Sequence, residues 1–378
     1  MEYKALKEIA KITMGQSPDS SSYNEEGDGL PFFQGNADFG ELYPNERVWC
    51  NDPKKIAEPG DILISVRAPI GALNYAKDRC CIGRGLAAIT IEDTAERNYV
   101  FHLLKARNTD LNNQGTGSTF KAIGKAVLEE LQVPQISSDE QQKCMNMMDL
   151  LESIIRERKK QIESFDNLIK ARFVELFGDI ATGQYKYETR KLGNVAEVGS
   201  SHRVFTTEFV DSGIPFYRGT EIGELANGQK PSDPYYISEE HYNRLANDDT
   251  KPKVGDLLMP SICNKGQVWM VDTEEPFYYK DGRVLCISAD RDIYDTRYLQ
   301  YFMKVKTEVE YPKMGSGSTF AEFKIFLLKD FDVLTPPKKY QEEFSAFVEQ
   351  VDKSKVAVQK ALDETQLLFD SLMQEYFG

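Results

Sequence analysis

The stretch Gly115-Thr116-Gly117-Ser118-Thr119-Phe120 returns 200 positions later as Gly315-Ser316-Gly317-Ser318-Thr319-Phe320. The match continues without a gap to Phe177-Gly178, which aligns with Phe377-Gly378. Because solenoid repeats have periods of about 20–50 residues, a repeat of this length indicates a tandem duplication of a whole domain. A duplicated chain is expected to form a pseudo-dimer that binds a two-part target.

The repeat extends upstream, but its offset changes as the loops differ in length. Three upstream segments have counterparts in the second half: Pro31–Gly35 in Pro215–Gly219, Gly60–Ile64 in Gly255–Met259, and Gly83-Arg84 in Gly282-Arg283. Loops tolerate such drift, whereas a long helix keeps its length. We therefore predict two variable regions, 1–139 and 179–339, each followed by a helical region, 140–178 and 340–378.

The helical regions carry apolar residues at heptad spacing and contain neither Gly nor Pro from Glu140 to Phe177. One stripe of the seam is Met148, Ile155, Ile162, Ile169 and Leu176 in the first copy, and Phe344, Val351, Val358 and Leu372 in the second. The neighbouring stripe of the second copy includes Leu362. A seam of four to five heptads predicts a coiled coil, although Arg158, Arg172, Lys355 and Thr365 interrupt it. In the alternative, each helix packs only on its own preceding domain.

Charge suggests that the two helices pair with each other. The first carries a run of Lys and Arg around Arg156–Lys160, and the second is rich in Asp and Glu. A pseudo-twofold axis between the copies would set the helices antiparallel. We assign partner binding on this coiled coil to six seam residues: Ile155, Ile162, Ile169, Val351, Val358 and Leu362.

The variable regions consist of short β-type runs broken by Gly, Pro and Asn, with one short helix in each copy. The predicted strands are Asp61–Val66, Leu86–Ile91, Leu257–Ile262 and Val284–Ile287, and the predicted helices are Tyr99–Arg107 and Tyr298–Lys306. This pattern is typical of an α+β fold with an irregular sheet.

Polar residues occupy matching loop positions in the two variable regions. We select as candidate DNA contacts Gln34, Asn36, Arg67, Arg84, Arg218, Thr220, Lys265 and Arg283. Arg, Asn and Gln can read base edges through two hydrogen bonds, and Lys mainly contacts phosphate. We expect Arg67 and Arg218 to read bases. In the alternative these residues belong to turns or solvated loops, and Arg84 and Arg283 serve the fold by bonding a carbonyl group.

No catalytic, metal or cofactor site is expected. The Gly-rich loops at Gly115–Thr119 and Gly315–Thr319 lack the Lys-Ser/Thr of a P-loop, so they are better interpreted as hinges or phosphate contacts. Asp233-Pro234-Tyr235-Tyr236 is similar to the Asp-Pro-Pro-Tyr motif of adenine methyltransferases, but lacks the second proline. The three histidines have no Cys or carboxylate at metal-ligand spacing.

Composition narrows the class of protein. The six cysteines show no CxxC spacing, which favours a reducing compartment. The chain has no run of 18 apolar residues that could span a membrane, and its N-terminus lacks the apolar core of a signal peptide. We therefore expect a cytoplasmic protein. The net charge of −14 argues against a nonspecific polyanion binder, but it leaves specific DNA recognition open because local charge decides that.

The order of these motifs resembles the specificity (S) subunits of type I restriction–modification systems. The resemblance rests on Gly60–Ser65, Ile82–Ala87, Gly117–Thr119 and the helix entries Leu131–Gln141 and Val333–Gln341. The first copy departs from that family by lacking its double proline, and the second has Tyr340-Gln341 in place of Glu-Gln.

The resemblance implies a subunit without catalysis or cofactor. Two target-recognition domains would each read half of a bipartite DNA site, and an antiparallel coiled coil with pseudo-twofold symmetry would set their spacing. Its partners would be double-stranded DNA, two methylation subunits and, through the complex, motor-nuclease subunits. The alternatives are a coiled-coil scaffold joining two protein-binding domains and a self-contained methyltransferase or nuclease, and the latter lacks the required motifs.

Overall fold

The computed structural model describes residues 2–116, 121–245, 251–314 and 321–377. The chain divides into two compact units: unit 1 comprises residues 1–160 and 358–378, and unit 2 comprises residues 161–357. The helices α5 (Ser138–Phe177) and α10 (Lys338–Phe377) each contribute one segment to both units. Most of the two Gly-rich loops, Gly115–Thr119 and Gly315–Thr319, lies outside the described residues.

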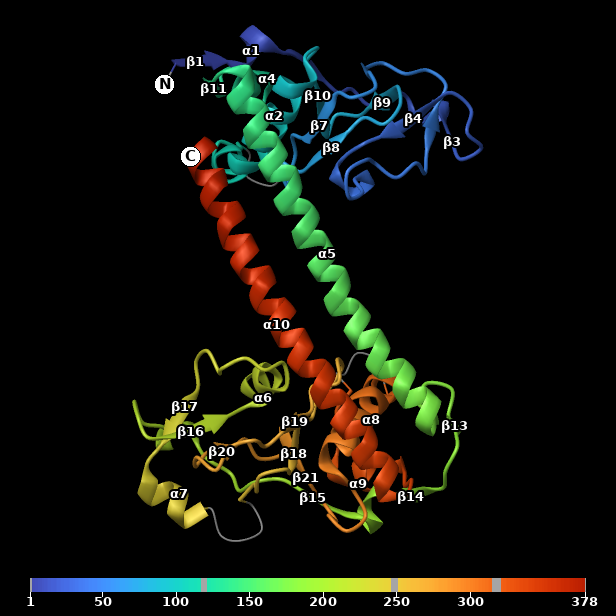
Figure 1. Cartoon of the computed structure of the whole chain (residues 1–378), viewed down its shortest axis with the longest axis vertical. Helices are drawn as coiled ribbons and strands as arrows, with labels where there is room; N and C mark the ends of the chain where they lie inside the picture. The colour runs from blue at the N-terminus through green and yellow to red at the C-terminus, as the bar shows by residue number, and fades with distance from the viewer. Residues whose placement is uncertain (1, 117–120, 246–250, 315–320, 378) are drawn as a thin grey trace. The chain divides into compact units, whose positions relative to one another are not determined.

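Unit 1 is built on an antiparallel sheet of four strands in the order β2-β10-β7-β8. Its bounds are β2 (Lys11–Met14), β7 (Ile62–Ser65), β8 (Leu73–Tyr75) and β10 (Leu86–Thr90). All residues of β7 and four of the five in β10 are buried, because both lie inside the sheet with apolar side chains on both faces. Figure 1 shows α2 (Thr94–Ala106) packed beside this sheet.

A second sheet in unit 1 has five strands in the order β3-β5-β4-β9-β6. Its bounds are β3 (Tyr23–Asn24), β4 (Leu30–Phe33), β5 (Trp49–Cys50), β6 (Ile56–Ala57) and β9 (Cys80–Ile82). The remaining elements of unit 1 are β1 (Glu2–Ala5), which pairs with β11 (Gln132–Gln135), and the helices α1 (Leu6–Ile9), α3 (Asn108–Asn113) and α4 (Lys125–Glu129).

Unit 2 repeats this plan with a four-stranded antiparallel sheet in the order β15-β21-β18-β19. Its bounds are β15 (Ala196–Gly199), β18 (Leu257–Pro260), β19 (Trp269–Met270) and β21 (Val284–Ala289). A three-stranded sheet places β16 (Ile214–Tyr217) between β17 (Tyr235–Ile237) and β20 (Tyr278–Tyr279). Two further sheets have two strands each: β12 (Gly178–Asp179) with β13 (Gln184–Tyr185), and β14 (Thr189–Lys191) with β22 (Asp332–Leu334).

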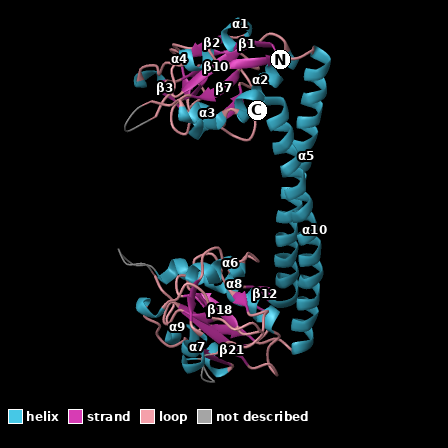
Figure 2. Cartoon of the chain, turned by 90° about the vertical axis from the view of Figure 1, so that its left-hand side faces the viewer, coloured by secondary structure: helices cyan, strands magenta, loops and turns pink. Residues whose placement is uncertain are grey.

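The helices of unit 2 lie against these sheets, as Figure 2 shows. Their bounds are α6 (Gly219–Ala226), α7 (Glu239–Leu245), α8 (Thr296–Glu310) and α9 (Ile325–Lys329). The four strands and two helices predicted from sequence correspond to β7, β10, β18, β21, α2 and α8, with ends shifted by up to five residues. The prediction of a mixed fold of helices and strands is confirmed.

The ends of α5 and α10 complete the cores of the units on which they lie. In unit 2, Phe177 at the end of α5 packs against Tyr298 of α8, with ring centroids 4.9 Å apart. In unit 1, Phe377 at the end of α10 packs against Tyr99 of α2 at 5.0 Å. All four rings are fully buried. The alternative in which each helix packs only on its own preceding domain is therefore wrong.

All four residues that interrupt the heptad pattern take part in bonds across the helix pair. In unit 2, Arg172 of α5 pairs with Glu343 of α10 at 2.5 Å, and Lys355 of α10 pairs with Asp166 of α5 at 2.6 Å. In unit 1, Arg158 of α5 donates to the hydroxyl of the fourth, Thr365 of α10. Because the α10 number falls as the α5 number rises, the paired segments run antiparallel in unit 2.

The expected pairing of a basic first helix with an acidic second helix is found only in part. Arg172 of the first helix does pair with an acidic residue of the second. Arg156 instead pairs with Glu41 of unit 1, 2.8 Å away, and the Lys355–Asp166 pair has its charges the other way round. The two helices are therefore joined by individual ion pairs, and not by a general attraction between one basic and one acidic helix.

The aromatic cluster of unit 2 gives a direct test of this packing. Phe344 of α10 is fully buried, with its ring centroid 5.2–5.7 Å from those of Tyr301, Phe173 and Phe177. We expect Phe344→Ala to lower the free energy of unfolding by about 3–5 kcal/mol, because it leaves a cavity among these rings. Urea unfolding in a Trp49→Phe background measures this, since Trp269 then reports on unit 2 alone.

Val356→Ala on the same helix is the matched control. Val356 is 69% exposed, so its truncation is expected to change stability by less than about 0.5 kcal/mol. Equal effects of the two substitutions would contradict the assignment of Phe344 to the core.

Candidate nucleic-acid interface

Three of the predicted DNA contacts in unit 2 line one open hollow. Arg218 follows β16 directly, Thr220 lies in the first turn of α6, and Arg283 precedes β21. The other lining residues are Gly219, Pro260, Ser261, Ile262, Gln267 and Lys280. The hollow forms where the ends of β16 and β18 meet the start of β21, because β18 and β21 pair with Pro260 opposite Val284.

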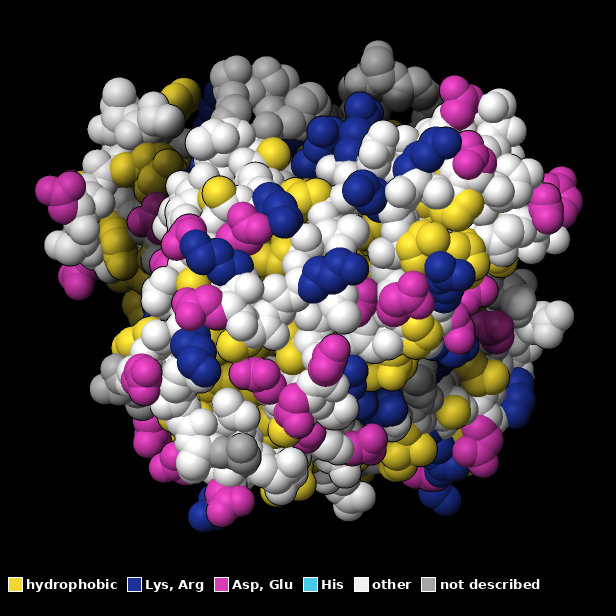
Figure 3. Space-filling model, turned by 90° about the horizontal axis from the view of Figure 1, so that it is seen from above, with side chains coloured by type: hydrophobic (Ala, Val, Ile, Leu, Met, Phe, Trp, Pro, Cys, Tyr) yellow, Lys and Arg dark blue, Asp and Glu magenta, His cyan; other side chains and the backbone are white. Residues whose placement is uncertain are grey.

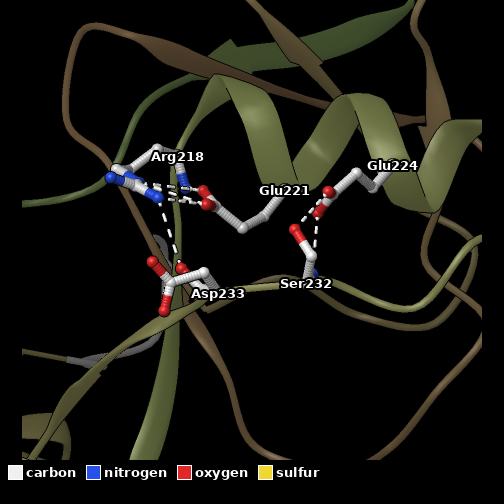
Figure 4. A network of polar contacts seen from close by, with 5 residues as sticks. All are labelled: Arg218, Glu221, Glu224, Ser232 and Asp233. Atoms are coloured by element: carbon white, nitrogen blue, oxygen red, sulfur yellow. Dashed lines mark hydrogen bonds and ion pairs between the residues drawn. The ribbon is translucent and has the colours of Figure 1, made fainter. Parts of the chain in front are cut away.

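Arg218 is held by a buried carboxylate (Figure 4). Its Nε donates to both oxygens of Glu221, at 3.2 and 3.1 Å, and its Nη2 donates to Glu221 and, at 3.3 Å, to the carbonyl oxygen of Asp233. Its backbone N–H also donates to Glu221, at 2.7 Å. The Glu221 side chain is 2% exposed, whereas that of Arg218 is 35% exposed.

The electrostatics of this pair follow from its geometry. Burial by itself raises the pKa of Glu221, but the hydrogen bonds from the side chain and backbone of Arg218 outweigh it, so the net pKa lies below the ordinary value. Glu221 therefore stays ionised, and the Arg218 guanidinium, which lies 4.2 Å from the ring centroid of Tyr235, stays fixed.

The same helix also holds the loop that follows it. The Glu224 carboxylate accepts hydrogen bonds from the hydroxyl and the backbone N–H of Ser232, at 2.6 and 3.1 Å. The backbone N–H of Gln229 donates to the carbonyl oxygen of Glu224 at 2.9 Å. The loop between α6 and β17 is thus tied back to α6 at several points.

The other cations of the hollow also have acidic partners. Arg283 pairs with Glu322, which also accepts from Lys324 at 2.8 Å, and Lys280 lies 3.7 Å from Asp281. Arg283 therefore bonds a carboxylate rather than a carbonyl group. Exposed ion pairs are worth only about 0–1 kcal/mol, so a phosphate group could replace these carboxylates at small cost.

Lys265 lies outside the lining of the hollow but next to it in sequence. It is exposed, and its backbone N–H donates to the side-chain oxygen of Gln267, a lining residue, at 3.0 Å.

In unit 1 three of the predicted contacts gather around Gly85. A Cβ at Gly85 would lie 2.3 Å from the carbonyl oxygen of Gln34, so only glycine permits this approach. Arg84 precedes Gly85, and Val66, the residue before Arg67, donates its N–H to Gly85 at 2.9 Å. Gln34, Arg67 and Arg84 are exposed.

Asn36 lies beside this group and begins the short 3₁₀ helix Asn36–Asp38. The Asp38 carboxylate accepts the backbone N–H of Gln34 at 2.7 Å and the guanidinium of Arg47 at 2.9 Å.

Sequence reasoning missed the acidic partners of the site. Glu221 could have been found, because it lies three residues after Arg218 at the start of a helix, the spacing at which an acid caps the first turn. Glu322 lies 39 residues from Arg283, and no local pattern connects them.

The motif Asp233–Tyr236 supports the fold. The Tyr235 ring packs against Arg218 and against Phe209, whose centroid is 4.7 Å away. Tyr236 lies in β17 opposite Pro215. Both tyrosines are thus engaged within unit 2.

His102 is packed in α2 and is 4% exposed. It lines a second hollow, in unit 1, and burial lowers its pKa although Asp149 and Glu152 lie 3.8 and 3.9 Å away. Across the described ranges, no group of three or more His, Cys, Asp or Glu is placed to hold a metal ion. None of the described helices is long and apolar enough to cross a membrane.

The six seam residues assigned to partner binding pack within the chain. Ile155, Ile169, Val351 and Leu362 are buried, and Ile162 and Val358 are half-buried. A role of these residues toward a separate partner stays a prediction.

Both signs of charge lie on the same face despite the acidic total. In the face drawn in Figure 3, Lys and Arg side chains lie among Asp and Glu side chains across the view. The net charge of −14 therefore does not make this face uniformly acidic.

The comparisons with known proteins agree with the geometry. Residues 1–164 match the model of the type I restriction modification DNA specificity domain. A protein of Methanocaldococcus jannaschii named as the MjaX specificity subunit of a type I restriction enzyme is 39% identical over 47% of this chain and 41% of its own length. The MjaIX specificity subunit of the same organism is 22% identical over 98% of this chain and 91% of its own.

Residues 1–164 thus match the specificity domain of type I restriction–modification systems, and nearly the whole chain is similar to their specificity subunits. The crystal structure of a type I restriction–modification S subunit from M. genitalium has the same fold, with a TM-score of 0.58 over 100% of this chain and 96% of that one, at 15% identity. The chain spans less than half of the MjaX subunit, but nearly all of the other two relatives.

The Glu221–Arg218 pair makes the stability of this protein depend on pH. Because the folded-state pKa of Glu221 lies below its ordinary value of 4.5, the pair stabilises the fold above about pH 4.5, and this contribution is lost as the pH falls through the folded-state pKa. We expect Glu221→Gln to cost about 1–3 kcal/mol at pH 7 and less at pH 3, measured by urea unfolding of the Trp49→Phe protein. The exposed Glu197→Gln is the control, and an equal cost at both pH values would contradict an ionised Glu221.

Proposed function

We propose that the chain reads DNA as a non-catalytic specificity subunit. Regions 1–139 and 179–339 serve as target-recognition domains that each read one half of a bipartite target, and regions 140–178 and 340–378 serve as spacer helices. The observation that carries this proposal is that the selected side chains lie at matching strand ends in both units. Gln34 and Arg84 flank one such place, and Arg218 and Arg283 flank the other.

A tandem duplication with pseudo-twofold symmetry accounts for the helix ends. Phe377 on Tyr99 in unit 1 and Phe177 on Tyr298 in unit 2 are the same contact at ring separations of 5.0 and 4.9 Å. The antiparallel pairs Arg172–Glu343 and Lys355–Asp166 support an antiparallel coiled coil between the copies. A 40-residue helix is about 60 Å long, enough to separate half-sites by more than one turn of DNA.

Binding at the candidate interface is an exchange of ion pairs. Arg283 and Lys280 already have carboxylate partners, so contact with phosphate replaces one anion by another. Specificity must then come from base contacts, because phosphate contacts carry no sequence information. This is how an acidic protein can bind DNA selectively.

The proposed partners are two methylation subunits, which bring S-adenosylmethionine and modify adenine, and through them motor-nuclease subunits. The six seam residues pack within the chain, so the docking surface would extend from them to other residues of the helix pair. Exposed apolar residues supply it: Leu150, Val356, Leu367 and Leu368.

If each unit reads its own half-site, substitutions act on one half only. We expect Arg67→Ala to cost about 1–3 kcal/mol of discrimination at one base pair of the first half-site. Lys265→Ala should weaken binding to all sequences alike and lower the salt slope by about one, as a lost phosphate contact does. Duplexes selected from a random library and then varied one base pair at a time measure both effects.

The exposed Arg190→Ala on β14 is the matched control and should change neither quantity. If Arg67→Ala relaxed both half-sites equally, a single composite DNA surface would replace the two-reader proposal. If the wild-type chain selected no sequence, the scaffold alternative would replace it.

The spacer role of the helices is tested by shortening both of them. Deleting 157–163 and 358–364 removes one heptad from each helix, which is about 10.5 Å of length. We expect the unspecified spacer between half-sites to shorten by about three base pairs, at 3.4 Å each, with both half-site sequences unchanged. Deletion from one helix only should instead disturb the antiparallel pairing, and an unchanged spacer in the double deletion would reject the ruler role.

A further inference from the structure

The guanidinium of Arg218 has few donors left for a base. An arginine carries five N–H donors: one on Nε and two on each terminal nitrogen. Glu221 and the Asp233 carbonyl accept from Nε and Nη2. Forked recognition of a guanine edge needs two parallel N–H groups, and here only Nη1 remains free of partners among the described residues. Arg218 is thus poorly placed to read a base.

The carboxylate that holds Arg218 would be left unpaired if the guanidinium turned toward DNA. The Glu221 side chain is 2% exposed, and stripping the partner from a buried charge is strongly unfavourable. The pair therefore stays closed when a ligand approaches, and its role is to hold other groups in place.

What Arg218 holds is the loop from Gly228 to Asp233. Arg218 bonds the Asp233 carbonyl at one end of this loop, and Glu224 bonds Ser232 and the backbone of Gln229. An ordered loop loses less conformational freedom on binding than a free one, which favours recognition.

The side chains that this loop presents are Gln229 and Lys230. Both are exposed, and neither side chain has a hydrogen bond or ion pair among the described residues. A Gln amide carries one donor and one acceptor side by side, the arrangement that pairs with the N6 and N7 atoms of adenine, and an ammonium group suits phosphate.

Unit 1 has the same kind of clamp after its corresponding strand. There Arg47 donates to the Asp38 carboxylate at 2.9 Å and to the Ala37 carbonyl at 2.6 Å. The backbone N–H of Asn45 donates to the Asp38 carbonyl at 2.8 Å and closes the intervening loop. An arginine bonded to both an acid and a carbonyl thus recurs, although it comes from a different sequence position. This recurrence indicates a structural role for the arginine in both units.

We propose that Gly228–Asp233 is the base-contacting loop of unit 2, that Gln229 is its reading side chain, and that Arg218 is a positioning residue that holds the loop. This inference rests on the proposed DNA recognition. It replaces the expectation that Arg218 itself reads a base.

The test uses the full chain and a random DNA duplex library, followed by binding of the selected duplex with each base pair changed in turn. We expect Gln229→Ala to lower discrimination about 5- to 150-fold at a single base pair that contains adenine, the range of one lost bidentate contact. Gln184→Ala, the same change at an exposed position on β13, is the matched control and should alter no base pair.

Arg218→Ala separates positioning from reading. If Arg218 acts through the loop, it weakens discrimination at the base pair of Gln229, and the double variant loses no more there than Gln229→Ala alone. Glu221→Gln should weaken the same base pair to a lesser degree. Thermal unfolding of each variant identifies any general loss of folding, and Arg218→Lys retains the charge without the fork and should behave as Arg218→Ala does.

Two outcomes would overturn the inference while the proposed function stands. In the first, the wild type selects a sequence and Gln229→Ala leaves its profile unchanged. In the second, Arg218→Ala relaxes a different base pair, which would make Arg218 a reader. Failure of the wild type to select any sequence removes the proposed function itself.

Discussion

The burial of one aromatic side chain at the end of each long helix is the constraint on which the structure depends. Phe177 closes the core of unit 2 against Tyr298, and Phe377 closes the core of unit 1 against Tyr99. Each unit thus contains a helix end supplied by the other half of the sequence. A change in length of one helix would withdraw a fully buried ring from a core, which is costly. This explains why the two helical regions align without a gap while the loops around them drift.

The polar residues of the helix pair fix its register. An apolar seam alone tolerates a shift by one heptad, because the same kind of side chains meet again. Arg172 and Lys355 each have one acidic partner on the opposite helix, at 2.5 and 2.6 Å. A shifted pairing would separate these charges. The polar residues that interrupt the heptad pattern therefore specify the register of the two helices, which the apolar seam alone does not.

The candidate interface shows why total charge was a poor guide to function. Its arginines already form ion pairs within the protein: Arg218 with a buried carboxylate, and Arg283 with Glu322 at the surface. These two ion pairs respond differently to a ligand, because a buried pair stays closed whereas an exposed pair exchanges its partner readily. Arginines that the sequence selects for the same role can therefore have different roles.

The sequence alone determined the repeat, the position and approximate length of both long helices, and the main strands, since these follow from periodicity and local propensity. It also identified the loops in which the candidate site lies, because Gly83-Arg84 and the residues before Arg218 recur in order in the two halves. It could not show that Glu221 holds Arg218, that Glu322 meets Arg283, or that Arg158 meets Thr365. Such contacts join residues whose neighbourhood depends on how strands and helices pack, and only the tertiary structure decides which polar groups are already occupied and which, like the side chain of Gln229, remain free to bind.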